Sequence, residues 1–216
     1  MYQNVIFDLD GTLLNTLEDL KDSTNYALAQ HGYPTRTLEE VRCFVGNGIR
    51  KLIDRAVPEG TSVEKTDKVF ATFREYYATH SRVKTSMYEG MEQVMDALKE
   101  RNISMAIVSN KADDAVKDLA KYYFAKYIDV AIGEREGISR KPAPDSVYEA
   151  MRLLGATKEN TVYVGDSDVD RATAKNAGIP CISVTWGFRS EELLVSLEPE
   201  YLIHKPEEIL SVVTGK

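Results

Sequence analysis

The chain contains 216 residues, of which 43% are hydrophobic and 28% are charged, so it is long enough for one large domain or for a core with an inserted subdomain. Its formal net charge of −7 argues against general binding to nucleic acid, which depends on clustered lysine and arginine. No apolar run is long enough to cross a membrane and no basic segment precedes the first one, so we expect a cytoplasmic protein without a membrane anchor or signal peptide.

The first predicted element is a short apolar strand that ends in two acids. Val5-Ile6-Phe7 is followed by Asp8 and Asp10, and Gly11 marks a turn. In an open α/β sheet, ligands bind outside the carboxyl ends of the strands, which is where these acids would lie. Two carboxylates so close raise each other's pKa unless a cation lies between them, which indicates either a shared proton or a bound metal. All-oxygen ligands favour Mg²⁺ as that metal. A solvated turn is an equally good explanation of an isolated DxDG, so the rest of the chain must decide.

The next stretch, from about Asn15 to Ser81, predicts helices only. Thr37 and Glu40 form a capping box, which marks a helix start. A long amphipathic helix carries Phe73 and Tyr77 on one face. We expect helices over about 17–28, from 38 onward, over 49–57 and over 63–80.

From Tyr88 onward, helices and strands alternate. We expect helices over 91–101, 114–123, 147–154 and 171–177, and strands over 103–108, 128–132, 161–164 and 182–185. With the first strand, these repeated βα units predict an α/β fold with a doubly wound parallel sheet and right-handed crossovers. The core then comprises 1–14 and 82–216, and residues 15–81 are an all-helical insertion. Because the insertion begins just after the acid pair, we expect it to serve as a cap that excludes water and selects substrate.

Candidate phosphate ligands follow two later elements. The strand over 103–108 ends in Ser109, Asn110 and Lys111, whose hydroxyl, amide and ammonium suit a phosphate oxygen. Taken alone, the Ser109-Asn110 pair is better explained as a helix N-cap. Lys141 lies in RKPAPD, where two prolines stiffen the backbone that carries this point charge. A rigid turn with a surface lysine is the simpler explanation of that segment alone.

A further acidic cluster follows the strand over 161–164. Asp166, Asp168 and Asp170 are spaced by two, as at the start of an EF-hand loop. That loop is excluded, because Arg171 stands where it needs glycine and Ala177 where it needs a bidentate glutamate. A helix N-terminus whose acids complement the helix dipole is the remaining alternative, and it is a sufficient role for Asp168, which we expect to face solvent.

Within the insertion, two glycines precede a predicted helix. Gly46, Asn47 and Gly48 would let the backbone approach a ligand, and Arg50 follows in the first turn of the helix. These four residues are our candidates for contact with the substrate. A plain turn between helices explains a lone GxG more simply.

Four motifs, in this order, resemble those of the haloacid dehalogenase superfamily of phosphatases. They are DLDGT at 8–12, the pair at 109–110, Lys141 in RKPAPD, and GDSDVD from Gly165. The resemblance covers the whole chain, and it implies a Rossmann-like core with a helical insertion of the first cap type. VGNGIRKLIDRA, RKPAPD and TWGF are most similar to the phosphoglycolate phosphatase branch, which implies hydrolysis of a small phosphate monoester.

The resemblance also implies a role for each matching residue. Asp8 would be the nucleophile that forms an aspartyl-phosphate, and Asp10 the general acid and then the general base. Mg²⁺ would be held by Asp8, the Asp10 carbonyl and Asp166, with Asp170 as a weaker partner. The transferring phosphoryl group would be bound by Ser109, Asn110 and Lys141. Asn15 departs from the pattern, since relatives often carry Asp there.

Several alternatives remain open at this point. Dehalogenation is disfavoured by Asp10, because dehalogenases typically need only the nucleophile. A sugar phosphomutase, a pyrophosphatase or a nucleotidase of the same fold is not excluded. A non-catalytic phospho-accepting or binding module is disfavoured by the length of the chain and its helical insertion. We expect a small phosphorylated metabolite as partner, no nucleic acid and no membrane, and the sequence does not distinguish a monomer from a dimer.

Overall fold

The computed structural model describes residues 1–215 and divides the chain into two compact units. Unit 1 consists of Met1–Leu14 and Met87–Lys216, and unit 2 of Asn15–Ser86. Within the described part of the chain, no helix is both long enough and apolar enough to span a bilayer.

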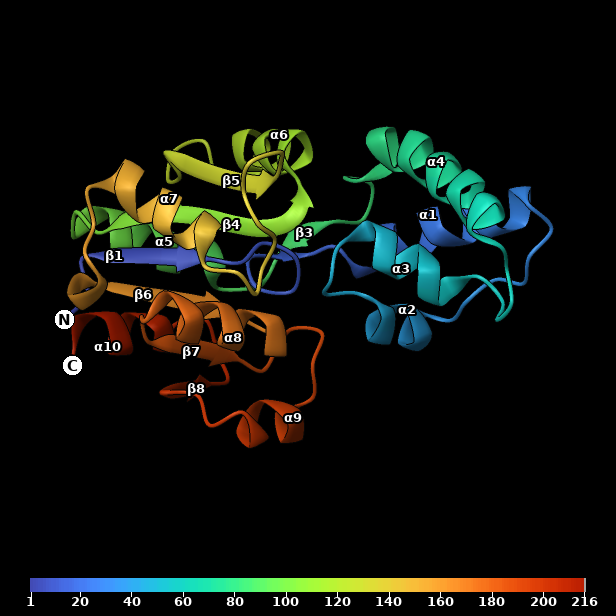
Figure 1. Ribbon diagram of the computed structural model, residues 1–216. Helices are drawn as coiled ribbons and strands as arrows, with labels where there is room; N and C mark the ends of the chain where they lie inside the picture. The colour runs from blue at the N-terminus through green and yellow to red at the C-terminus, as the bar shows by residue number, and fades with distance from the viewer. Residues whose placement is uncertain (216) are drawn as a thin grey trace. The chain divides into compact units, whose positions relative to one another are not determined.

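Unit 1 is built on a six-stranded parallel sheet (Figure 1). The strand order is β5-β4-β1-β6-β7-β8, so β1 lies between the two halves. The chain runs from β1 outward through β4 and β5, then returns to β6 and continues through β7 and β8. This reversal makes the carboxyl ends of β1 and β6 the expected ligand crevice of such a sheet. The strands are β1 (Asn4–Phe7), β4 (Ser104–Ala112), β5 (Val130–Glu134), β6 (Thr161–Gly165), β7 (Cys181–Val184) and β8 (Tyr201–Ile203).

Both faces of the sheet are covered by helices, as its apolar strands require. On β1, Val5 and Phe7 point into one core and Ile6 into the other, because side chains alternate along a strand. The first core is completed by α5 (Met91–Glu100), α6 (Asp113–Tyr123) and α10 (Glu208–Thr214). The second is completed by α7 (Asp145–Leu154) and α8 (Asp168–Ala177). The predicted doubly wound α/β fold is therefore confirmed.

The predicted elements of unit 1 are present, with differences at their ends. β4 continues to Ala112 rather than ending at Val108, with a shift of register toward β5 between these two residues. α8 begins at Asp168, because Ser167 caps it and forms a capping box with Asp170. The sequence did not predict β8, α9 (Glu191–Ser196), α10 or the short 3-10 helix Lys158–Asn160.

Unit 2 is helical, as the sequence predicted. Its helices are α1 (Leu17–Gln30), α2 (Leu38–Phe44), α3 (Ile49–Ala56) and α4 (Val63–His80). The capping box of Thr37 and Glu40 is confirmed at the start of α2. Two short strands, β2 (Leu14–Asn15) and β3 (Ser86–Met87), pair with each other where the chain passes between the units.

One buried carboxylate joins the two ends of unit 2. Asp19, in the first turn of α1, is 2% exposed. It accepts hydrogen bonds from the backbone N–H of Val83 at 3.1 Å, of Lys84 at 3.0 Å and of Thr85 at 2.9 Å. It also accepts one from the Thr85 hydroxyl at 2.8 Å. The side chain of Asp19 thus joins the entering and leaving segments, in addition to the pairing of β2 with β3.

Candidate active site

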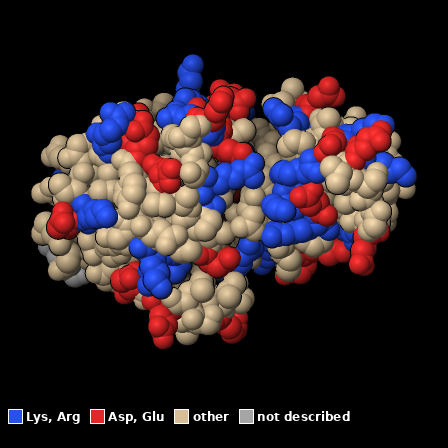
Figure 2. All heavy atoms as spheres, viewed as in Figure 1, with Lys and Arg blue, Asp and Glu red and all other residues tan. Residues whose placement is uncertain are grey.

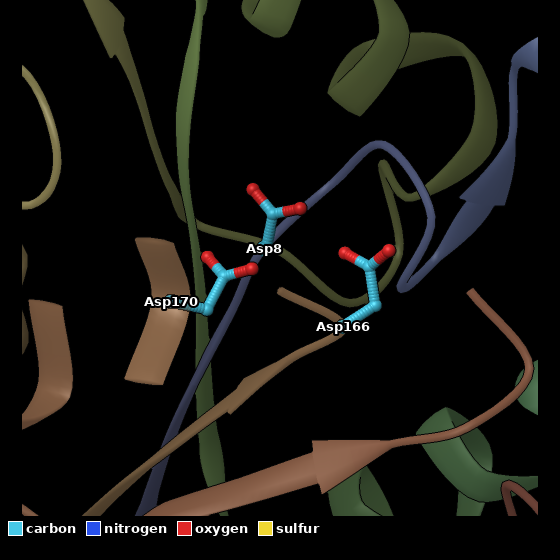
Figure 3. Close-up of side chains that lie close together, drawn as sticks. All are labelled: Asp8, Asp166 and Asp170. Carbon is cyan, nitrogen blue, oxygen red and sulfur yellow. The ribbon is translucent and has the colours of Figure 1, made fainter. Parts of the chain in front are cut away.

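Three buried carboxylates meet at the carboxyl ends of β1 and β6. Asp8 follows β1, Asp166 follows β6, and Asp170 lies in the first turn of α8. One oxygen from each side chain lies within 4.8 Å of the others, and all three residues are at most 6% exposed (Figure 3). The two strands that flank the sheet reversal therefore bring acids 158 to 162 residues apart in sequence into one cluster.

The turn after β1 separates Asp10 from this cluster. Gly11 has a φ of +92°, and a Cβ there would lie 2.4 Å from Oδ2 of Asp166, so only glycine fits. The carboxylate of Asp10 instead accepts a hydrogen bond from the buried ammonium of Lys111 at 3.0 Å. The two acids of the first motif thus contact different lysines, which lets them serve different roles.

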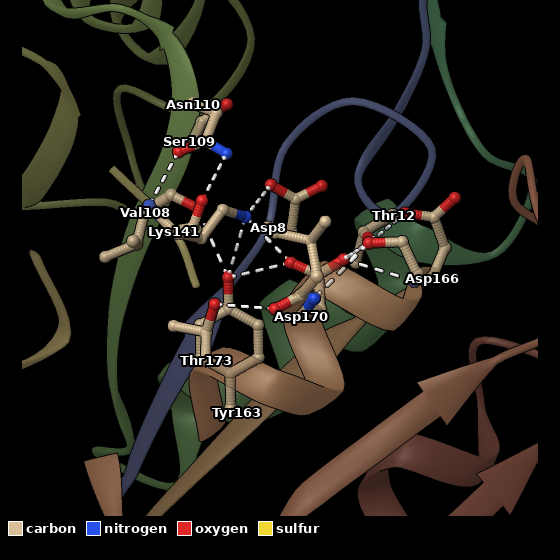
Figure 4. Close-up of polar contacts among 12 residues, drawn as sticks. Asp8, Thr12, Val108, Ser109, Asn110, Lys141, Tyr163, Asp166, Asp170 and Thr173 are labelled. Atoms are coloured by element: carbon tan, nitrogen blue, oxygen red, sulfur yellow. Dashed lines mark hydrogen bonds and ion pairs between the residues drawn. The ribbon is translucent and has the colours of Figure 1, made fainter. Parts of the chain in front are cut away.

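Lys141 lies at the centre of the acidic cluster. Its Nζ donates to Oδ1 of Asp8 at 2.6 Å and to Oδ1 of Asp170 at 2.7 Å (Figure 4). The backbone of Lys141 is held from both sides by Asn110, whose Nδ2 donates to its carbonyl at 3.0 Å and whose Oδ1 accepts from its N–H at 2.8 Å. Asn110 therefore holds Lys141 in place. Ser109, 6% exposed, accepts from the Lys111 N–H at 3.2 Å.

Both oxygens of Asp170 are already hydrogen bonded. Oδ1 accepts from Lys141 and from the Tyr163 hydroxyl at 3.1 Å. Oδ2 accepts from the Ser167 N–H at 3.2 Å and from its hydroxyl at 2.5 Å. Since a carboxylate has about four lone-pair positions, Asp170 is better suited to anchor Lys141 than to bind a cation directly.

Asp166 is held by a segment that follows β7. The N–H of Phe188 donates to Oδ2 of Asp166 at 2.6 Å, and the Thr12 hydroxyl lies 3.5 Å from Oδ1. The indole N–H of Trp186 donates to the Thr12 carbonyl at 3.1 Å, which ties this segment to the turn after β1. A Cβ on Gly187 would lie 2.2 Å from the Cβ of Asp166. The glycine therefore leaves room for the carboxylate.

Replacement of Gly187 by alanine is expected to displace Asp166 and so to weaken the binding of Mg²⁺ that the family resemblance implies for this carboxylate. The added methyl overlaps with Asp166, so we also expect a loss of about 2 kcal/mol in the free energy of unfolding, the usual cost of overpacking. Isothermal titration with Mg²⁺ and urea unfolding measure the two effects. Gly155→Ala is the matched control, because the added Cβ meets nothing within 4 Å. Any loss of stability in that variant comes from the backbone φ of +65° alone. Equal Mg²⁺ affinity in the two variants would contradict the role of Gly187.

The cluster carries an excess of negative charge that a divalent cation would offset. Of the three carboxylates, Asp8 and Asp170 form ion pairs with the ammonium of Lys141, whereas Asp166 accepts a hydrogen bond from the neutral N–H of Phe188. Burial, with the charge of Asp170, raises the pKa of Asp166 to about 7, and burial also raises the pKa of Asp8 despite the contact with Lys141. Although burial opposes it, the charges of Asp170 and Asp8 raise the pKa of Lys141, which stays charged. A hard dication bound by carboxylate oxygens would offset the excess of negative charge, so the residues fit Mg²⁺.

The candidate substrate residues of the insertion lie in unit 2. Gly48 precedes α3 with a φ of 83°, and Gly46 has a φ of 119°. Oδ1 of Asn47 accepts from Arg55 at 2.8 Å. Arg50 forms ion pairs with Asp54 and Asp67, so its charge is compensated within unit 2. Figure 2 likewise shows basic and acidic side chains interspersed on the visible face of this unit.

Sequence reasoning overlooked several residues that shape the site. Tyr163 was read only as part of a strand, yet its hydroxyl contacts Lys141. TWGF was notable only for its similarity to the family, and the backbone contact of its last residue with Asp166 was not foreseen. Asp168, expected to face solvent, is half exposed and pairs with Arg189 at 3.2 Å. The aromatic residue at an inward-facing position just before an acidic motif was the available signal for Tyr163.

Comparison with known proteins identifies relatives over most of the chain. A family model described as haloacid dehalogenase-like hydrolase matches residues 5–184. Phosphoglycolate phosphatase 1 of Pseudomonas aeruginosa is 32% identical over 95% of this chain and 78% of that protein. The pyrophosphatase PpaX of Halalkalibacterium halodurans is 30% identical over 98% of this chain and 97% of that protein. A solved structure from Lactobacillus delbrueckii subsp. bulgaricus, provisionally described as a phosphoglycolate phosphatase, has a TM-score of 0.94 at 33% identity and covers 100% of this chain and 99% of that one.

Proposed function

The chain belongs to the haloacid dehalogenase-like hydrolases, and from this premise we propose that it is a Mg²⁺-dependent phosphatase of small phosphate monoesters, with 2-phosphoglycolate as the preferred substrate. The observation that carries the proposal is the cluster of Asp8, Asp166 and Asp170 around Lys141, with Asp10 set apart on Lys111. Relatives named as phosphoglycolate phosphatases support the choice of substrate.

In the first step, Asp8 attacks phosphorus. Lys141 holds Oδ1 of Asp8, so we assign the attack to Oδ2. The new O–P bond forms as the bond to the leaving alcohol breaks, and the alcohol oxygen takes a proton from Asp10. The ammonium of Lys141 and the hydroxyl of Ser109 stabilise the charge on the transferring phosphoryl oxygens.

In the second step, water hydrolyses the aspartyl-phosphate. Asp10, now deprotonated, removes a proton from water as the water attacks phosphorus, and the Asp8 carboxylate is regenerated with release of phosphate. Asp8, the Asp10 carbonyl and Asp166 are the residues that would hold Mg²⁺, and Asp170 would support them through Lys141. When bound, the ion supplies charge neutralisation, which lets an anionic nucleophile approach an anionic ester.

In this proposal, unit 2 serves as a cap. It follows the turn that carries Asp10, and Gly46, Asn47, Gly48 and Arg50 are its candidates for contact with the substrate. The expected partner is a small phosphorylated metabolite, with neither nucleic acid nor membrane involved, and a cytoplasmic location belongs to the same proposal.

Phosphate release from a panel of substrates tests the function. The panel contains 2-phosphoglycolate, sugar phosphates, nucleotides and pyrophosphate, each with Mg²⁺ and with EDTA. We expect release only with Mg²⁺, with 2-phosphoglycolate hydrolysed fastest. Asp8→Asn protein purified in the same way is the control for contaminating phosphatases.

The other outcomes would redirect the proposal. Preference for pyrophosphate would favour the activity named for the relative from Halalkalibacterium halodurans, which is the second candidate. Transfer of the phosphoryl group to a sugar phosphate instead of water would identify a mutase. Release that persists in EDTA would contradict the metal dependence, and absence of release from every substrate would contradict the phosphatase itself.

A further inference from the structure

Tyr163 lies fully buried against the lysine of the candidate site. It stands on β6 in register with Ile6 of β1, with its ring in the core covered by α7 and α8. Its hydroxyl is 3.0 Å from Nζ of Lys141, 3.1 Å from Oδ1 of Asp170 and 3.4 Å from the Val108 carbonyl (Figure 4). A phenol is therefore in contact with both members of a buried ion pair.

The hydrogen bonds around the ammonium account for all of its protons. Lys141 has three N–H groups, and these meet Oδ1 of Asp8, Oδ1 of Asp170 and the hydroxyl of Tyr163. Because the hydroxyl accepts from Lys141, its own proton is free to be donated to Asp170, the nearer of its two acceptors. The contacts of Lys141, Asp170 and Tyr163 thus form a closed triangle.

We propose that Tyr163 is a positioning residue, which fixes the Lys141 ammonium where it contacts Asp8 and the transferring phosphoryl group. The inference rests on the proposed function, since it takes Lys141 as the ligand of that group. When a phosphoryl oxygen competes for the N–H that now meets Asp8, the contacts with Asp170 and Tyr163 keep the ammonium in place. Without the hydroxyl, one buried N–H loses its acceptor and Asp170 loses a donor.

The variant Tyr163→Phe removes this contact while retaining the ring, which lies with its centroid 5.6 Å from Nζ of Lys141. We expect kcat for 2-phosphoglycolate to fall by about 10-fold to 100-fold, the factor that one hydrogen bond to a charged group contributes. The matched control is Tyr127→Phe. Tyr127 is also buried in unit 1, but its hydroxyl donates to Asp96 and not to the site.

A second measurement reports on the ammonium itself and does not depend on turnover. Proton–nitrogen NMR of the lysine ammonium groups is recorded for both variants, and the signal of Lys141 is assigned by its loss in Lys141→Arg. We expect a slowly exchanging signal in the wild type and in Tyr127→Phe. In Tyr163→Phe we expect exchange with water to become faster by about tenfold or more, because one hydrogen bond to the ammonium is lost.

The two readouts distinguish failure of the inference from failure of the function. If the wild type releases phosphate but Tyr163→Phe matches Tyr127→Phe in kcat and in ammonium exchange, the positioning role is wrong and the phosphatase stands. If no substrate is hydrolysed and the Lys141 signal still depends on Tyr163, the phosphatase is wrong and the positioning of the ammonium stands. Loss of thermal stability equal in the two variants, with no selective effect on kcat or on Lys141, would leave Tyr163 a structural residue only.

Discussion

Replacement of Asp8 by asparagine is expected to lower phosphate release by about 10⁵-fold or more, the scale of loss seen when a nucleophile is removed. The amide of asparagine does not form the aspartyl-phosphate, although it has nearly the same shape as the carboxylate. Because the variant removes one of three mutually repelling buried carboxylates, we expect the melting temperature to be unchanged or higher. Phosphate release and thermal unfolding measured on the same preparation test both expectations.

The control for this variant is Asp118→Asn, an exposed position on α6. It makes the same chemical change away from the cluster and should leave both measurements unaltered. Undiminished release by Asp8→Asn would remove this residue as the nucleophile. A collapse of the melting temperature would instead show that its charge supports the fold through Lys141.

Asparagine at position 10 is expected to lower kcat by about 10²-fold to 10⁴-fold, the usual contribution of a general acid and base. The loss should fall mainly on the second step, because water then lacks a base while Asp8 remains able to attack. With p-nitrophenyl phosphate, whose leaving group needs no proton, we expect one rapid release of nitrophenol and a trapped phosphoryl group. Rapid-mixing kinetics detects the release of nitrophenol, and intact mass spectrometry detects the phosphoryl group trapped on the protein.

The double variant Asp8→Asn with Asp10→Asn is the control for the trapped group, and it should gain no mass. With 2-phosphoglycolate, a poorer leaving group, we expect the single variant Asp10→Asn to show a slower first step as well. Steady turnover by Asp10→Asn at the wild-type rate would assign the proton transfers to another residue. In that case the contact of Asp10 with Lys111 would be structural.

The fold was predictable because its information is local and periodic. Three local patterns each indicated one type of secondary structure. They are the apolar run before Asp8, the alternation of helix and strand after Tyr88 and the capping box at Thr37. The family resemblance implied that Asp8 and Asp166 hold one cation, and parallel strands place their carboxyl ends at one edge of the sheet, where such acids can meet. The structure brings Asp8, Asp166 and Asp170 together in this way.

The contacts inside the site were not predictable in the same way. Asn110 forms two hydrogen bonds with the backbone of Lys141, and Asp170 accepts hydrogen bonds from four donors. These contacts depend on the distances between residues from different parts of the chain. Periodicity shows which face a side chain occupies, but not which neighbour it meets. The position of Tyr163 just before an acidic motif could place it near the site, but nothing in the pattern showed that its hydroxyl would contact an ion pair.

The elements near the C-terminus were missed for a related reason. β8 has three residues, α9 six and α10 seven, which is too short for a repeated apolar pattern to develop. Such elements are stabilised mainly by tertiary packing, as Ile203, Ile209 and Val213 show by their burial in the core. Long elements such as α4 were found with the correct ends, because their pattern repeats over several turns.

The hydrogen bonds of Asp19 make unit 2 an exchangeable module. They join the start of α1 to residues 83–85, and the pairing of β2 with β3 brings the ends of the insertion together. Both cores of unit 1 are built without any residue of unit 2. Since the entropy of closing a loop grows slowly with its length, the sheet tolerates an insertion of almost any size whose ends are so joined. If unit 2 acts as the proposed cap, its replacement in evolution would change the choice of substrate while the proposed chemistry at the strand ends is inherited unchanged.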